Sequence, residues 1–150
     1  MKKLLYILFI VSSALAFSQT DYKEIPTEKL DTKKVLLAKS FIQSYLEKCL
    51  TMDYSIPSGF KVSEGLEKLF TDKISEVCES NRQHFGTINL DNLNSAYKNK
   101  TSLFNGQELY IFDAKTEKDK TIQYLSAWIS KDNTIEGMVI TSYKPFKKKK

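Results

Sequence analysis

The spacing of apolar residues changes at Gly86, and this change limits the folds open to a chain of 150 residues. Before Gly86, apolar side chains recur every three or four positions, as they do on one face of a helix. After it, apolar and polar side chains alternate, as they do on the two faces of a strand. Helices followed by a meander of antiparallel strands predict an α+β fold, with the helices packed on one face of a sheet of about four strands.

Two helical regions precede Gly86. The first is predicted from about Thr32 to Leu50, with Asp31 or Thr32 as its N-terminal cap. The second begins near Ser63, and the pair Thr71-Asp72 divides it into a short helix and a longer one. Gly86 is a natural stop for the longer helix.

Four strands are predicted after Gly86. The first, over 87–90, is weak, and its polar continuation over 91–94 is interpreted as a bulge or a loop. Three stronger strands are rich in aromatic and β-branched residues: Leu109–Ala114, Ile122–Ser130 and Ile135–Tyr143. The strand over 122–130 is apolar on both faces. We therefore expect the helices on one face, and a curled sheet edge, a ligand cavity or a partner on the other.

The basic residues are concentrated at the two ends of the chain. The sequence holds 23 Lys and Arg against 18 Asp and Glu, a net charge of +5. Six lysines lie at the termini: Lys2, Lys3, Lys147, Lys148, Lys149 and Lys150. Without them 17 basic residues face 18 acidic ones, so the rest of the chain has a net charge of −1. It carries no basic stripe with interleaved aromatic residues, and we expect no nucleic-acid partner.

The N-terminus has the pattern of a bacterial signal peptide. Two lysines precede an apolar run over 4–14, and small residues then offer cleavage after Ala16 or after Ser18. The run is shorter than the roughly 20 apolar residues that a transmembrane helix needs. We predict that residues 1–18 are removed and that the protein is exported to the periplasm or the extracellular space, with no transmembrane span after cleavage. An uncleaved N-terminal anchor is the alternative.

The remaining chain is predicted to form a leader over 19–31, a single α+β domain over 32–143 and a lysine-rich tail over 144–150. Lysine runs attract anionic lipid surfaces and other polyanions. The four terminal lysines are therefore candidates for weak contact with an anionic surface. A solvated tail without a partner is the alternative.

Two cysteines, Cys49 and Cys78, lie on the apolar stripes of predicted helices. An oxidising compartment outside the cell would permit one disulfide between them. Two free thiols in the core are the alternative. With a single His and no Cys-x-x-Cys motif, the sequence indicates no metal site and no cofactor.

Three segments resemble a known superfamily: Phe70-Thr71-Asp72-Lys73-Ile74, His84-Phe85-Gly86 and the stretch 132–140. They are similar to small secreted bacterial domains of the nuclear transport factor 2-like, or cystatin-like, superfamily. In those domains a helix ending in Phe-Gly precedes a curved antiparallel sheet whose last strand opens with Ile-x-Gly. The resemblance covers about Val35 to Tyr143 and implies a cone-shaped fold with a pocket between sheet and helices. Members include enzymes, ligand carriers and interaction modules, so it implies a fold rather than a function.

Aromatic side chains of the predicted strands are the candidates for a ligand site. Aromatic rings with polar edges can line a small-molecule pocket, and four residues form the candidate set: Tyr110, Phe112, Tyr124 and Trp128. Ordinary core packing is the alternative. Alternation along a strand places Tyr124 and Trp128 on one face, but it leaves open whether that face is internal.

We therefore expect an exported, non-enzymatic binding or interaction domain. It would hold a small apolar ligand or a protein partner in the concavity between sheet and helices. The alternative is a small hydrolase or isomerase with Asp113 or His84 as acid/base. A structure with both groups at the outer surface would argue against the enzyme, and the sequence shows no nucleophile elbow or phosphate loop in its favour.

Overall fold

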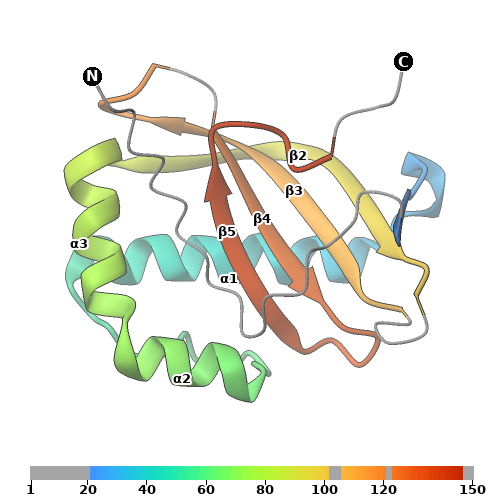
Figure 1. Ribbon diagram of the computed structural model, residues 1–150, viewed down its shortest axis with the longest axis horizontal. Helices are drawn as coiled ribbons and strands as arrows, with labels where there is room; N and C mark the ends of the chain where they lie inside the picture. Colours follow the sequence, from blue (N-terminus) through green and yellow to red (C-terminus); the bar gives the residue numbers. More distant parts are fainter. Residues whose placement is uncertain (1–20, 102–105, 121–122, 147–150) are drawn as a thin grey trace.

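The computed structural model describes residues 21–101, 106–120 and 123–146, which form an α+β fold (Figure 1). Within these residues three α-helices pack on one antiparallel sheet of five strands. The strands are hydrogen-bonded in the order β1-β2-β3-β4-β5, so the sheet is open and β1 and β5 form its edges. The predicted fold class is confirmed, whereas the predicted number of about four strands is wrong.

The first helix, α1, spans Thr32–Thr51, as predicted to within one residue. The Asp31 carboxylate caps it by accepting hydrogen bonds from the backbone N–H groups of Lys33, at 2.9 Å, and Lys34. The helix ends at Met52, which adopts a left-handed conformation. Four apolar side chains of its stripe are buried in the core: Ala38, Phe41, Ile42 and Tyr45.

The second helical region is a short helix, α2 (Glu64–Asp72), followed by a longer one, α3 (Ile74–Phe85), as predicted. The division falls at Lys73, however, and Thr71-Asp72 lies inside α2. Lys73 leaves the helical geometry, with a φ of −133°. The Thr71 hydroxyl donates instead to the backbone carbonyl of Glu67 at 3.1 Å, so it does not cap α3.

Three strands lie where the alternation predicts them: β3 (Glu108–Thr116), β4 (Gln123–Ile129) and β5 (Ile135–Thr141). The strand before them, β2 (Ile88–Asn99), is much longer than the predicted 87–90. Its register with β3 shifts between Leu90 and Leu93 and again before Ser95. These shifts are bulges, which keep the polar stretch within the sheet.

The fifth strand, β1 (Tyr22–Glu24), lies in the segment predicted to be a leader. It pairs with the end of β2, with Tyr22 opposite Asn99. The Tyr22 hydroxyl donates a hydrogen bond to the Gln107 side-chain oxygen at 2.8 Å, and the ring is buried. Three residues are too few to show a period of two, so nothing in the local sequence indicates this strand.

Gly86 turns the chain from α3 into β2. Its φ of +67° and ψ of −137° suit glycine alone, and a Cβ atom there would lie 2.8 Å from Glu117 Oε2. That oxygen accepts hydrogen bonds from the backbone N–H and the hydroxyl of Thr87, both at 3.0 Å, which lower the pKa of the Glu117 carboxyl. The end of α3 is thereby held against the segment that follows β3.

Both faces of the sheet carry buried apolar side chains, as the pattern of β4 predicts. The main core lies between the helices and one face. On the opposite face, here called the outer face, five buried residues form a second cluster: Tyr22, Tyr97, Leu109, Ile111 and Phe146. Phe146 comes from the segment predicted to be a tail, and its ring centroid lies 4.9 Å from that of Tyr22 and 4.8 Å from that of Tyr97. Part of the tail therefore belongs to the folded domain.

We expect Phe146→Ala to lower the free energy of unfolding by about 2 kcal/mol, because a buried ring is replaced by a methyl group. Urea unfolding followed by circular dichroism measures the change. Tyr143→Ala is the matched control, since Tyr143 belongs to the same segment but is 45% exposed, and its effect should stay within about 0.5 kcal/mol. Equal losses for the two variants would contradict a stabilising role for Phe146.

Candidate functional site

The four aromatic residues predicted to line a ligand site lie on two opposite faces of the sheet. Tyr110 and Phe112 are fully buried in the main core, beneath the helices. Tyr124 and Trp128 are partly buried against the cluster on the outer face. The sheet separates the two pairs, so the four residues do not line one cavity.

Tyr110 belongs to a polar network in the core. Its hydroxyl donates a hydrogen bond of 2.5 Å to the Glu108 carboxylate, and the Lys34 ammonium lies 3.3 Å from the same carboxylate oxygen. Burial, together with the bonded carboxylate, raises the pKa of the Tyr110 hydroxyl. The network joins α1 to β3, and we assign it a structural role.

The two groups proposed as an acid/base are both at least partly exposed to solvent. His84 is exposed near the end of α3, with Nδ1 2.8 Å from the backbone carbonyl oxygen of Ser80. Asp113 is partly exposed, on the strand face that carries Leu109 and Ile111, and it accepts a hydrogen bond from the Asn94 side chain at 2.9 Å. The hydrolase or isomerase alternative stays a prediction.

Cys49 and Cys78 form a disulfide that links the last turn of α1 to α3, with their Cα atoms 5.2 Å apart. The sequence left open a disulfide or two free thiols, and the structure has the disulfide. Lys147 to Lys150 and the predicted signal peptide lie outside the described residues. Contact of the lysines with an anionic surface therefore stays a prediction.

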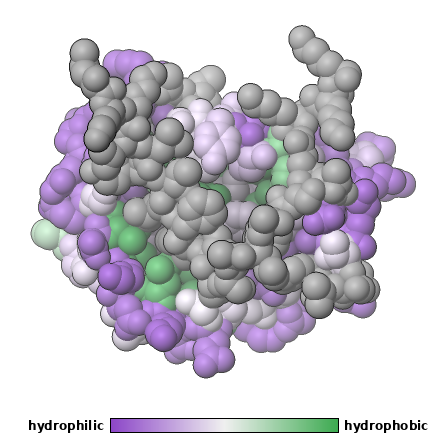
Figure 2. Space-filling model, in the orientation of Figure 1, coloured by the Kyte–Doolittle hydropathy of each residue, from purple (hydrophilic) through white to green (hydrophobic). Residues whose placement is uncertain are grey.

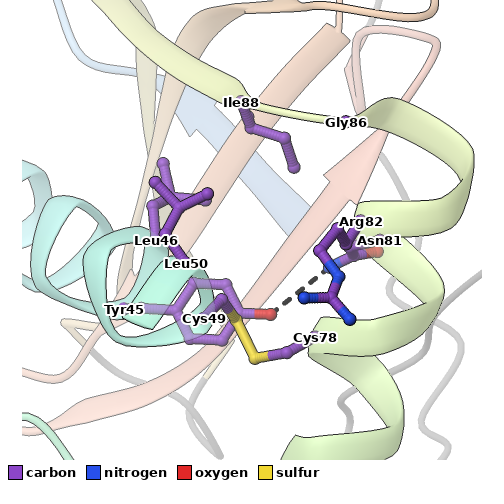
Figure 3. A pocket seen from close by; sticks show the side chains of 9 residues that line it. All are labelled: Tyr45, Leu46, Cys49, Leu50, Cys78, Asn81, Arg82, Gly86 and Ile88. Atoms are coloured by element: carbon purple, nitrogen blue, oxygen red, sulfur yellow. Dashed lines mark hydrogen bonds between the residues drawn. A yellow bond between two sulfur atoms is a disulfide. The ribbon is translucent and has the colours of Figure 1, made fainter. Parts of the chain in front are cut away.

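A crevice opens beside the disulfide, between α1, α3 and the start of β2 (Figure 3). Nine residues line it: Tyr45, Leu46, Cys49, Leu50, Cys78, Asn81, Arg82, Gly86 and Ile88. Its cavity volume is about 20 Å³, and its free space of about 350 Å³ includes open solvent. Most of the wall is apolar, as in pockets that bind small organic molecules.

A second lobe, with a cavity volume of about 10 Å³, continues the crevice toward β4 and β5. The two lobes share Tyr45, Leu46, Asn81 and Ile88. The second lobe is completed by four further side chains: Leu125, Met138, Val139 and Ile140. Figure 2 shows apolar surface between α3 and β5. The crevice therefore reaches from the end of α1 to the edge of the sheet.

Tyr45 and Asn81 form the polar centre of the crevice. Both side chains are buried, and the Asn81 amide donates a hydrogen bond of 3.3 Å to the Tyr45 hydroxyl (Figure 3). Burial raises the pKa of Tyr45 to about 12, and the bond from Asn81 only partly opposes this shift. The hydroxyl is therefore protonated at neutral pH. At the rim, the Arg82 guanidinium pairs with the Glu79 carboxylate.

The sequence carries one signal of this centre. Asn81 follows Val77 by four positions and Cys78 by three, so it lies on the apolar stripe of α3, where a buried amide needs a partner. The partner, Tyr45, lies 36 residues earlier in the chain. Nothing local to either residue indicates that they meet.

No protein-family model, curated protein or solved structure matches the chain. Among the described residues, His, Cys, Asp and Glu side chains form no group able to hold a metal ion. In the same part of the chain, no helix is long and apolar enough to cross a membrane. The candidate site therefore rests on the geometry of the crevice.

Proposed function

We propose that this protein is an exported, non-enzymatic binding domain that holds a small apolar molecule in the crevice between α1, α3 and the sheet. One observation carries the proposal: two adjoining apolar lobes converge on a single buried polar pair, Tyr45 and Asn81. Concave apolar walls with a few placed polar groups are typical of small-molecule sites.

Two further features support the proposal. The disulfide ties the two helices that form the walls, which reduces the conformational freedom lost when a ligand binds. A disulfide is also typical of exported proteins, which fits the predicted signal peptide. The place of the crevice, between helices and sheet, is where the nuclear transport factor 2-like resemblance would put a pocket, and membership of that superfamily is part of the proposal.

The test is a titration with toluene followed by two-dimensional ¹⁵N NMR, together with native mass spectrometry of protein purified from its source. Leu50 lines the mouth of the crevice and is 53% exposed, so Leu50→Trp narrows the mouth with little disturbance of the core. We expect this variant to bind the probe about tenfold more weakly, a loss of about 1.4 kcal/mol.

Leu36→Trp is the matched control. Leu36 lies on the same helix, is 57% exposed and lines neither lobe. Its variant should bind the probe like the unaltered protein. Equal weakening in both variants, or no binding by the unaltered protein and no co-purified molecule, would contradict the proposed site.

A further inference from the structure

We infer that the crevice selects an uncharged molecule that carries one hydroxyl group, an alcohol or a phenol, on an otherwise apolar body. The inference rests on the proposed function and adds the chemical class of the ligand. It follows from the hydrogen-bonding capacity that the polar centre leaves unused, from the charge of the lining residues and from the size of the space.

The polar centre has one donor and one acceptor to spare. A tyrosine hydroxyl both accepts and donates, and an asparagine side chain offers an oxygen as well as its amide protons. The Asn81 amide donates to the Tyr45 oxygen. Within the part of the chain that the structure describes, no acceptor is bonded to the Tyr45 proton and no donor to the Asn81 oxygen.

A hydroxyl group suits either spare position. It can accept the Tyr45 proton through its oxygen or donate its own proton to the Asn81 oxygen. The Tyr45–Asn81 bond, at 3.3 Å, is longer than the usual 2.9–3.0 Å of an N–H···O bond, so a third group can join the pair without breaking a strong contact. An ether or a carboxylate supplies the acceptor but lacks the donor.

The charge of the crevice favours a neutral ligand. The side chains at the polar centre are uncharged, and the tyrosine stays protonated at neutral pH because burial raises its pKa to about 12. The cation nearest to them in the lining is Arg82, which lies at the rim and already pairs with Glu79. An anion placed at the centre would exchange its hydrating water molecules for two neutral side chains, and this desolvation is costly in free energy.

The space limits the size of the molecule. The cavity volume of the crevice is about 20 Å³, which suits a hydroxyl group, so the apolar body of the ligand, a single ring or a short branched chain, would lie at the open mouth. The walls around the polar pair are aliphatic, aromatic or sulfur-containing. A phenol with one alkyl substituent has the required hydroxyl group and apolar body.

The test compares four probes that share a methylbenzene frame on the oxidised protein: p-cresol, 4-methylanisole, toluene and p-toluate. Two-dimensional ¹⁵N NMR titrations give the dissociation constants and follow the side-chain amide of Asn81 directly. We expect p-cresol to bind about tenfold more tightly than 4-methylanisole or toluene, as for one or two hydrogen bonds in a buried site. We also expect p-cresol, and not toluene, to shift the Asn81 amide resonances strongly.

Tyr45→Phe keeps the ring and removes the hydroxyl, so it should abolish the preference for p-cresol. Tyr97→Phe is the control, because it removes a hydroxyl from a buried tyrosine on the outer face and should leave the preference unchanged. The dispersion of the NMR spectrum shows whether each variant is folded. If a variant does not fold, the shifts of the Asn81 amide in the unaltered protein still test the inference.

The outcomes separate the two levels of the proposal. If none of the four probes binds, the proposed small-molecule site itself fails. If toluene and p-cresol bind equally well, an apolar site remains and the selection of a hydroxyl group is overturned. If p-toluate binds most tightly, the site selects an anion through Arg82, and the inference is overturned as well.

Discussion

Replacing both Cys49 and Cys78 with alanine is expected to lower the free energy of unfolding by about 3.5 kcal/mol. The two cysteines are 29 residues apart, and the intervening chain contains α2 and the loop before it. The crosslink restricts this long segment in the unfolded state, and that restriction is lost in the variant. Guanidinium unfolding at equilibrium, monitored by circular dichroism, measures the difference.

Reduction provides the control for the disulfide. A reducing agent should destabilise the unaltered protein by the same amount and leave the double variant unaffected, because the variant has no bond to break. A double variant within about 0.5 kcal/mol of the unaltered protein would contradict the prediction, as would a strong response of the variant to the reducing agent. Since both sulfurs line the crevice, the same variant also shows whether ligand binding depends on fixed walls.

Lys34→Met is expected to lower the free energy of unfolding by about 3 kcal/mol at neutral pH. The Lys34 and Glu108 side chains are only 10% and 12% exposed, and their charged atoms lie 3.3 Å apart. Removing the ammonium group leaves a nearly buried carboxylate without its cation, although the carboxylate still accepts the hydrogen bond from the Tyr110 hydroxyl. An unpaired buried charge is far more costly than a lost surface ion pair.

Two further variants separate two causes of lost stability: a buried charge without a partner, and the loss of any ion pair. Adding Glu108→Gln to Lys34→Met removes the uncompensated charge and should recover part of the lost stability. Lys73→Met breaks the ion pair with Glu76, whose side chains are 63% and 78% exposed, and should cost no more than about 0.5 kcal/mol. Similar losses for Lys34→Met and Lys73→Met in chemical unfolding would show that burial of the pair has no effect.

The elements that depend on local sequence could be predicted. Helix α1 and the strands β3, β4 and β5 are long enough for their apolar residues to repeat several times, and Asp31 caps α1 through bonds to residues two and three positions away. The order of helices and strands then favours one layered arrangement. Even the disulfide could be named as one of two alternatives, because only two cysteines are present.

The sequence by itself therefore determined the α+β class, the position of the turn at Gly86 and the candidate disulfide. Only the tertiary structure decided that β1 joins the sheet, that Phe146 packs on Tyr22 and Tyr97, and which face of β4 meets the helices. It also decided that Tyr45 and Asn81 meet inside a crevice, whereas the predicted aromatic set is divided between two faces. The physical reason is range: periodicity reports which residues share a face, but contacts between distant segments depend on how the faces pack.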